Sequence, residues 1–297
     1  MKKNTIVYGL LISIIVIYFT HKIVQLLLSS LYFSPSDRIN VLFYGPESAF
    51  YSIDKAGGRN YMMYFQPDLK MDVPGGYGSY KVGSLGKLVS LDKKPEIYRK
   101  TFAFATASFV NIYFYPKDQT VHTGNVAEMI SKKPSMQNIF FQYSNANIFD
   151  RIYLFFEFSK HRNDDFHIMG FTELEDKAHQ DVLFEDKGFV KNSIGLLYQK
   201  VYRGEKKNTQ ILYSKKYIIA QKMSNLLEGN GIRVNDLSLD LKRRNKCVVI
   251  ESGTEKERSI TATFLAKYFK CDLIEGSTDV YDIIFVLGSE LEVDWEV

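Results

Sequence analysis

The sequence has 297 residues, of which 45% are hydrophobic, 14% aromatic and 24% charged, a composition that excludes a wholly disordered or fibrous chain. Its 38 Lys and Arg residues outnumber its 34 Asp and Glu residues by 38 − 34 = 4, too small an excess to indicate a nucleic-acid-binding protein. A chain of this length suits one large or two modest domains.

The N-terminal residues predict a membrane anchor in residues 1–33. Lys2 and Lys3 precede the uncharged residues Thr5–Thr20, and apolar character continues to Phe33. A helix rises about 1.5 Å per residue, so a helix ending near Leu28 spans a hydrocarbon core of about 30 Å. Because basic residues favour the cytoplasmic side, we expect a single-pass cell-membrane protein with its N-terminus in the cytoplasm and its bulk outside.

Two other interpretations of this segment remain open. A cleaved signal peptide needs small residues just after its apolar run, but Phe19–Lys22 offers no such site and Ser29–Ser30 comes late. The second alternative is a buried helix of a soluble protein. The retained anchor agrees best with the length of the apolar run.

The remaining residues predict an α/β protein with domains at 37–165 and 208–297. Residues 34–37 form a short polar hinge, and 166–207 form a connector whose charges at 173–177 indicate exposure. The expected strands lie at 39–44, 49–53, 60–65, 110–115, 209–213, 232–237, 247–250 and 282–287, and the expected helices at 101–109, 148–160, 217–228 and 259–269. The β-α-β-β-α-β order of the second domain is typical of a small α/β sandwich.

Common catalytic motifs are missing from the sequence. Gly86-Lys87 lacks the first glycine and the Ser or Thr of a phosphate loop. The five histidines, at positions 21, 122, 161, 167 and 179, form no helical metal-binding pair. No G-x-S-x-G nucleophile elbow occurs. The motifs therefore indicate no cofactor.

Cys247 and Cys271 are too few for a disulfide framework or a four-ligand zinc site. Export would permit a bond between them. Each begins a separate apolar run, however, so we expect two separate buried thiols.

Residues 39–115 resemble the LytR–CpsA–Psr (LCP) family. Ile39–Gly45 (INVLFYG) is similar to the family's first strand, and Tyr51–Asp54 and Tyr64–Asp68 to the two halves of its hairpin. Asp72–Gly75 is similar to its D-I-P-G and Lys81–Gly83 to its K-I-N segment. The resemblance implies an extracytoplasmic α/β/α domain on one membrane helix. It also implies transfer of lipid-pyrophosphate-linked glycopolymers to peptidoglycan.

The departures from this family fall on its catalytic positions. The family's R-S-D falls on Tyr44-Gly45-Pro46, and the arginine of its R-D pair has become Pro67 while Asp68 remains. Its later arginine cluster has no match in residues 120–150. Each missing arginine forfeits charge-assisted hydrogen bonds of about 1.5–3 kcal/mol. A lone carboxylate repels phosphate unless a metal intervenes.

Residues 210–288 resemble the LytR C-terminal domain, a small α/β module often appended to LCP proteins. The matching features are the strand Gln210–Tyr213, Ala220, the run Leu227–Val234, Ala262, Leu265 and the closing strand Asp282–Gly288. This second resemblance implies a binding or accessory role and supplies no catalytic residue.

The two resemblances favour a catalytically degenerate LCP-like envelope protein that binds or scaffolds glycopolymers, a pseudoenzyme of the cell wall. The expected partners are the membrane and a polyprenyl-linked glycan or peptidoglycan, without nucleic acid. The alternative is an active phosphotransferase, with Asp68 as a Mg²⁺ ligand and Arg59, Lys81 and Lys87 as the nearest cations. A structural envelope protein unrelated to glycopolymer lipids is the third class.

Overall fold

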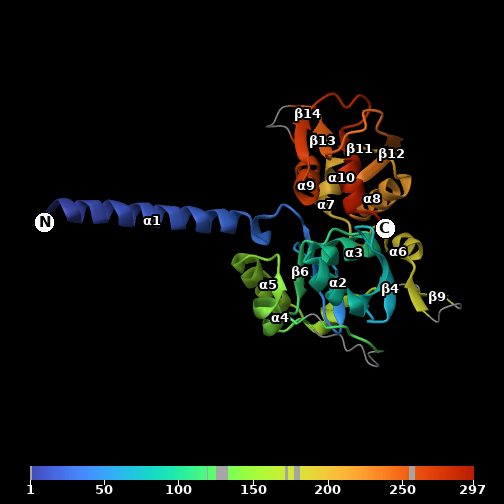
Figure 1. Cartoon of the computed structure of the whole chain (residues 1–297), viewed down its shortest axis with the longest axis horizontal. Helices are drawn as coiled ribbons and strands as arrows, with labels where there is room; N and C mark the ends of the chain where they lie inside the picture. Colours follow the sequence, from blue (N-terminus) through green and yellow to red (C-terminus); the bar gives the residue numbers. More distant parts are fainter. Residues whose placement is uncertain (1, 119, 125–132, 171–172, 177–180, 254–257) are drawn as a thin grey trace.

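The computed structural model of the chain describes residues 2–118, 120–124, 133–170, 173–176, 181–253 and 258–297. A long N-terminal helix projects from a folded part that contains three β-sheets with helices packed against them (Figure 1). The sequence predicts this mixed α/β class with an apolar N-terminal helix, and the prediction is confirmed.

The projecting helix is α1 (Lys2–Leu28). Its stretch Leu10–Leu28 is long and apolar enough to cross a membrane, and none of that stretch is buried against the rest of the chain. The interpretation as a buried helix of a soluble protein is therefore wrong. A signal sequence shares this length and composition, so α1 by itself shows the capacity to span a membrane and no more.

A six-stranded sheet, in the order β7-β6-β1-β2-β3-β8, organises the part of the chain that we call the first lobe. Its strands are β1 (Arg38–Phe43), β2 (Ser48–Asp54), β3 (Asn60–Phe65), β6 (Ile112–Tyr115), β7 (Tyr143–Ser144) and β8 (Phe166–Ile168). Every residue of β1, β2 and β3 is buried, which is typical of strands covered on both faces.

Helices cover both faces of this sheet. α2 (Leu85–Asp92) and α3 (Glu96–Thr106) share a hydrophobic cluster with one face, and α4 (Met136–Phe141) and α5 (Ile148–Lys160) share a cluster with the other. Along β1, Leu42 belongs to the first cluster, whereas Val41 and Phe43 belong to the second, because successive strand residues point to opposite faces. The result is the α/β/α layering that the LCP resemblance implies.

A second sheet of four strands has the order β5-β4-β10-β9. Its strands are β4 (Leu69–Val73), β5 (Gly78–Lys81), β9 (Glu173–Asp176) and β10 (Asp181–Phe184), and the helices α6 (Asp186–Ser193) and α7 (Lys200–Glu205) follow in the chain. Residues 166–207, expected as a connector, thus contribute one strand to the first sheet and two to the second. Lys177 lies outside the described residues. The division into independent domains stays a prediction.

The second lobe, residues 208–297, contains a five-stranded sheet in the order β12-β11-β15-β13-β14. Its strands are β11 (Asn208–Tyr213), β12 (Arg233–Leu239), β13 (Val248–Glu251), β14 (Asp272–Glu275) and β15 (Ile283–Val286), and its helices are α8 (Tyr217–Gly229), α9 (Ile260–Phe269) and α10 (Gly288–Asp294). All predicted elements of this region are present, and β14 and α10 are additional.

The two lobes meet at a buried polar cluster that we call the lobe joint. Gly229, at the end of α8, lies so close to Ala107 that a Cβ on Gly229 would overlap the Ala107 carbonyl. The side-chain oxygen of the fully buried Asn230 accepts hydrogen bonds from Phe109 N at 3.2 Å and Ser108 Oγ at 3.3 Å. A polar side chain in such a place is stabilising only because its groups are paired.

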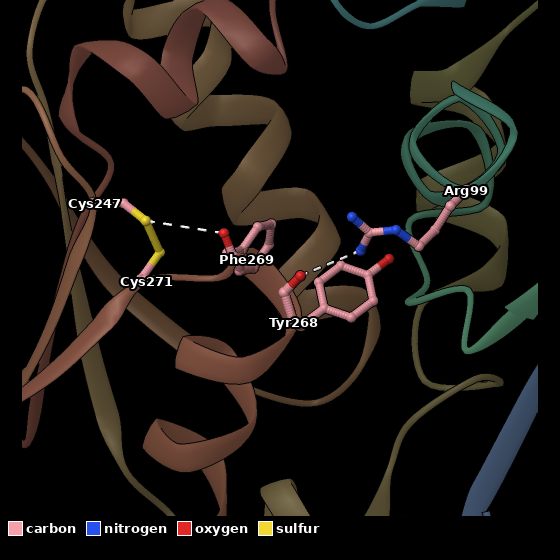
Figure 2. Close-up of a disulfide and its surroundings, with 5 residues drawn as sticks. All are labelled: Arg99, Cys247, Tyr268, Phe269 and Cys271. Carbon is pink, nitrogen blue, oxygen red and sulfur yellow. Dashed lines mark hydrogen bonds between the residues drawn. A yellow bond between two sulfur atoms is a disulfide. The ribbon is translucent and has the colours of Figure 1, made fainter. Parts of the chain in front are cut away.

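Arg99 of α3 makes a second contact between the lobes. Its guanidinium donates to the Tyr268 carbonyl at 3.3 Å and lies over the Tyr268 ring at 4.5 Å (Figure 2). Arg99 also pairs with Glu96 at 2.7 Å, and Lys270 of the second lobe pairs with the same carboxylate at 2.9 Å. One hydrophobic cluster includes residues of both lobes.

Cys247 and Cys271 form a disulfide (Figure 2), so the expectation of two separate thiols is wrong. Each cysteine immediately precedes a strand, and β13 and β14 are parallel neighbours with Val248 opposite Asp272. This register places the two cysteines side by side, with Cα atoms 5.0 Å apart, well within the range that a disulfide bridges.

Candidate functional site

The position that the LCP resemblance assigns to phosphate binding lies where β3 ends and β4 begins. Asp68 occupies this turn, and Lys81 is the last residue of β5, paired in register with Lys70 of β4. The hairpin therefore brings Lys81 Nζ to 3.5 Å from Asp68 Oδ1. The two side chains are 41% and 38% exposed, and ion pairs so exposed contribute little to stability.

Residues 120–124 cover this turn. Gly124 N donates to the second carboxylate oxygen of Asp68 at 3.2 Å. Gly83 N donates to Pro67 O at 2.8 Å, and His122 N donates to Gly83 O at 2.9 Å. A Cβ on Gly83 would overlap the His122 carbonyl, so this close approach of two backbone segments requires glycine.

Tyr44 lies where the resemblance expects a phosphate-binding charged residue. Its hydroxyl accepts a hydrogen bond from Gly86 N at 2.7 Å and donates to Gly83 O at 3.4 Å. Its ring, 1% exposed, packs against Tyr98 with 4.3 Å between centroids. Burial is the main cause that raises the pKa of Tyr44 to about 12, so the group is neutral at physiological pH and offers no charge to an anion.

The other two predicted cations, Arg59 and Lys87, are in no ion pair with Asp68 that the structure records. Arg59 is in the exposed turn before β3, at the opposite end of that strand, and a six-residue strand is about 20 Å long. Lys87 is exposed on α2. Of the four candidate residues, Asp68 and Lys81 are the two that the structure joins by an ion pair.

The described residues around Asp68 form no group that could hold a metal ion by itself. In the described part of the chain, no group of three or more His, Cys, Asp or Glu side chains could hold a metal ion. One Asp68 oxygen faces the Lys81 ammonium and the other the Gly124 amide. A Mg²⁺ ion here would have a single carboxylate and would depend on phosphate oxygens and water for its other ligands.

The first arginine after residue 120 serves a structural role. Arg151, on α5, donates to the carbonyls of Ile139 at 2.5 Å and Gln142 at 3.1 Å. Those carbonyls lie at the C-terminal end of α4, where cations stabilise unpaired carbonyl groups. Residues 125–132, part of the region in which the family has its arginine cluster, lie outside the described residues and contain no arginine.

Sequence reasoning missed a polar cluster where the chain leaves α1, which we call the anchor joint. The Asp150 carboxylate accepts from Leu31 N at 2.7 Å and from Asn147 N at 2.9 Å. Asn147 Nδ2 donates to Leu26 O at 3.2 Å, and Lys55 Nζ donates to Ser34 O at 2.8 Å. Burial is the main cause that raises the pKa of Asp150, and the two amide donors oppose it.

The available sequence signal for the anchor joint was the N-x-x-D spacing of Asn147 and Asp150. This spacing is a capping box at the start of α5, and both of its reciprocal hydrogen bonds are present. The spacing predicts a helix start, but it contains nothing about the contact with Leu31. The segment 34–37, expected as a hinge, is bonded to the start of α7. The Asp37 carboxylate accepts hydrogen bonds from Lys200 N and Val201 N.

A cavity of about 790 Å³ lies beside the anchor joint. One wall is the chain from Leu26 to Pro35, and another is formed by α9 and the residues before it. The charged side chains in its lining are Arg99, Arg258, Lys267, Lys270, Glu96 and Asp150. We call it the anchor-side cavity; it combines apolar walls with an excess of cations.

No protein-family model matches this chain, and no curated protein sequence matches it. Among solved structures, TagV of Bacillus subtilis, an LCP-family protein, is 9% identical with a TM-score of 0.35, over 52% of this chain and 94% of that chain. Bacillus subtilis yvhJ, described as a transcriptional regulator, is 10% identical with a TM-score of 0.36, over 52% and 94%. A putative transcription regulator from Eubacterium siraeum is 12% identical with a TM-score of 0.33, over 53% and 91%. Similarities of this size do not establish a family.

Proposed function

We propose that this protein is a membrane-anchored envelope protein of the LCP type that lacks the pyrophosphate grip and acts by binding or scaffolding glycopolymers. The observation that carries the proposal is the composition of the Asp68 turn. Among the described residues, Lys81 is the cation in ion-pair contact with Asp68, and a neutral tyrosine and a proline stand at the positions where the resemblance expects charged groups. Arginine is the side chain favoured for bidentate recognition of phosphate groups.

The proposed topology places residues after about 34 outside the cytoplasm. The apolar stretch of α1 and the preceding lysines support this orientation. The Cys247–Cys271 disulfide supports it independently, because disulfides persist in oxidising compartments outside the cytosol. Protease added to intact spheroplasts should digest the folded part, whereas full protection would contradict this topology.

The first test of the function measures thermal unfolding of the full chain in nanodiscs with polyprenyl pyrophosphate and Mg²⁺. We expect no more stabilisation than with the same lipid carrying a hydroxyl end group. A ligand that binds the folded state raises its stability in proportion to the logarithm of occupancy. A shift specific to the pyrophosphate and dependent on Mg²⁺ would therefore overturn the degenerate site.

The second test measures transfer of a lipid-linked glycan to peptidoglycan. We expect no transfer by the wild-type chain and none after Pro67→Arg, because catalytic groups act as a unit and one restored arginine lacks its partners. Co-sedimentation with isolated cell walls should instead retain the wild type and Asp68→Ala equally. Transfer that Asp68→Ala abolishes would show an active phosphotransferase.

A further inference from the structure

α5 lies at the end of the folded part from which α1 projects (Figure 1), and three of its large apolar side chains are exposed. Ile148, Ile152 and Phe156 are 52%, 40% and 57% exposed. Their spacing of four residues places them on one face of the helix, and we call them the α5 stripe. No charged side chain of α5 is exposed before Lys160.

Hydrogen bonds at the anchor joint fix the depth of the first residue of this stripe, Ile148, relative to α1. Asn147, the residue before α5, donates to the carbonyl of Leu26, which lies in the last turn of the apolar stretch Leu10–Leu28. Asp150 accepts from the backbone of Leu31, just beyond that stretch. Ile148, between them, therefore lies at the level where the hydrocarbon core of a membrane spanned by α1 would end.

Neighbouring aromatic side chains extend the same surface. Tyr32 and Phe33 lie in the short helical turn Leu31–Phe33, a few residues after α1, and are 64% and 48% exposed. The Tyr32 ring makes an edge contact with Tyr153 of α5 at 6.1 Å. Aromatic side chains are enriched at the membrane–water boundary, and exposed apolar surface that continues from a membrane helix loses contact with water when it enters that boundary.

The anchor-side cavity adds positive charge at the same level. Its lining includes Leu26 and Leu28 at the end of α1 and the exposed Lys267 of α9. Basic residues near a surface of anionic lipid gain about 1 kcal/mol each at physiological ionic strength. Apolar side chains and cations at one depth are complementary to a bilayer that contains anionic headgroups.

We propose that the α5 stripe and the rim of the anchor-side cavity rest in the outer face of the bilayer, so that the folded part lies on the membrane at a fixed orientation. This inference rests on the membrane-anchored topology proposed above. The proposed binding partner of this surface is lipid. Because α1 anchors the chain, it holds the α5 stripe and the cavity rim next to the bilayer.

The test uses the full chain in nanodiscs whose acyl chains carry bromine, which quenches nearby fluorophores. A fluorophore is attached to one engineered cysteine at a time: Ile152→Cys in the stripe, Ile15→Cys in α1, or Leu241→Cys. Leu241 is 87% exposed and follows β12, at the end of the second-lobe sheet opposite to the start of α9. Both native cysteines are disulfide-bonded and do not react.

We expect loss of fluorescence at Ile152→Cys and Ile15→Cys and none at Leu241→Cys. Adding Phe156→Glu should restore fluorescence at Ile152→Cys without changing Ile15→Cys, since a charge in the stripe opposes entry into lipid. Quenching at Ile15→Cys without quenching at Ile152→Cys would overturn the inference and leave the anchor intact. Absence of quenching at Ile15→Cys would refute the anchor itself.

A second arm replaces anionic lipid with neutral lipid. Quenching at Ile152→Cys should be weaker in neutral nanodiscs, and Lys267→Glu should reduce the difference between the two bilayers. Equal quenching in both bilayers would overturn the assigned role of the cavity cations.

Discussion

The lobe joint and the Asp68 turn place similar polar groups in opposite surroundings. At the lobe joint, Asn230 is fully buried and its side chain bonds to Ser108 and Phe109 of the first lobe and to Leu226 of the second. At the turn, Asp68 and Lys81 are about two-fifths exposed and share one long contact. At the lobe joint, a buried and paired polar side chain fixes two parts of the molecule relative to one another. At the turn that resembles a catalytic site, backbone hydrogen bonds hold the loop, whereas the charged side chains stay partly exposed.

The largest expected effect is at the lobe joint. Asn230→Ala would leave the buried Phe109 amide without its Asn230 acceptor and remove the donor to Leu226 O. An unpaired buried group costs about 1–3 kcal/mol, so we expect a loss of about 3 kcal/mol in the free energy of unfolding. Denaturant unfolding measures it, with exposed Asn235→Ala as the control. Equal effects of the two substitutions would contradict a stabilising role for the buried Asn230 side chain.

The anchor joint should respond with a smaller loss. Asp150→Ala removes the acceptor of the Leu31 and Asn147 amides, and we expect a loss of about 2 kcal/mol because one of the two bonds is buried and the other only partly buried. Asp165→Ala, which removes a similar contact to a backbone amide from an exposed carboxylate, is the matched control. Unfolding of the full chain in detergent compares them, and a larger loss for Asp165→Ala would contradict the assignment.

Glu96 makes the contact between the lobes sensitive to acid. Burial, the largest influence, acts to raise its pKa, but Arg99 and Lys270 together outweigh it and lower the pKa to about 2. A lowered carboxyl pKa contributes stability above the ordinary value of 4.5, and that contribution is lost as the pH falls from 4.5 to about 2.

Glu96→Gln should therefore lower the unfolding midpoint at neutral pH and have a shrinking effect as the pH falls below 4.5. Exposed Glu290→Gln is the control. The expected result is that the unfolding midpoints of the wild type and Glu96→Gln converge in acid. A constant difference between the two midpoints across the pH range would show that Arg99 and Lys270 do not act through this carboxylate.

The smallest effect should follow Asp68→Ala or Lys81→Ala. Exposed ion pairs contribute about 0–1 kcal/mol, and we expect less than about 0.5 kcal/mol from each substitution. A double-mutant cycle in denaturant measures the coupling. A coupling energy well above that value would show that the Asp68–Lys81 pair stabilises the fold, and would contradict its description as a weak exposed ion pair.

The sequence predicts well the elements whose residues have uninterrupted spacing, and poorly those whose starts are interrupted or go unrecognised. The bounds of β3 and α5 agree with the predicted strand 60–65 and helix 148–160, since both have continuous apolar or helical spacing. α2 was missed because Gly83 and Gly86 interrupt its start; its first turn is held instead by the bond from Gly86 N to the Tyr44 hydroxyl. α3 begins five residues before the predicted start, and the preceding Pro95 was the unused signal.

The contacts between distant residues could not be predicted from spacing. Lys81 reaches Asp68 because β4 and β5 pair across Gly75 and Gly76, both with positive φ, and the pattern of residues does not fix that register. The disulfide likewise depends on β13 and β14 being neighbours in a sheet whose strand order differs from chain order. Local patterns predict elements, whereas the candidate site depends on how those elements pair.

The redox state of Cys247 and Cys271 reports the compartment in which the second lobe of each molecule folded. The two cysteines are the only ones in the chain, so a maleimide that adds mass to thiols should leave exported molecules unshifted in a non-reducing gel. Molecules whose folded part stayed in a reducing cytosol should gain two additions. The ratio of the two bands would thus count correctly oriented chains in living cells, without a fused reporter.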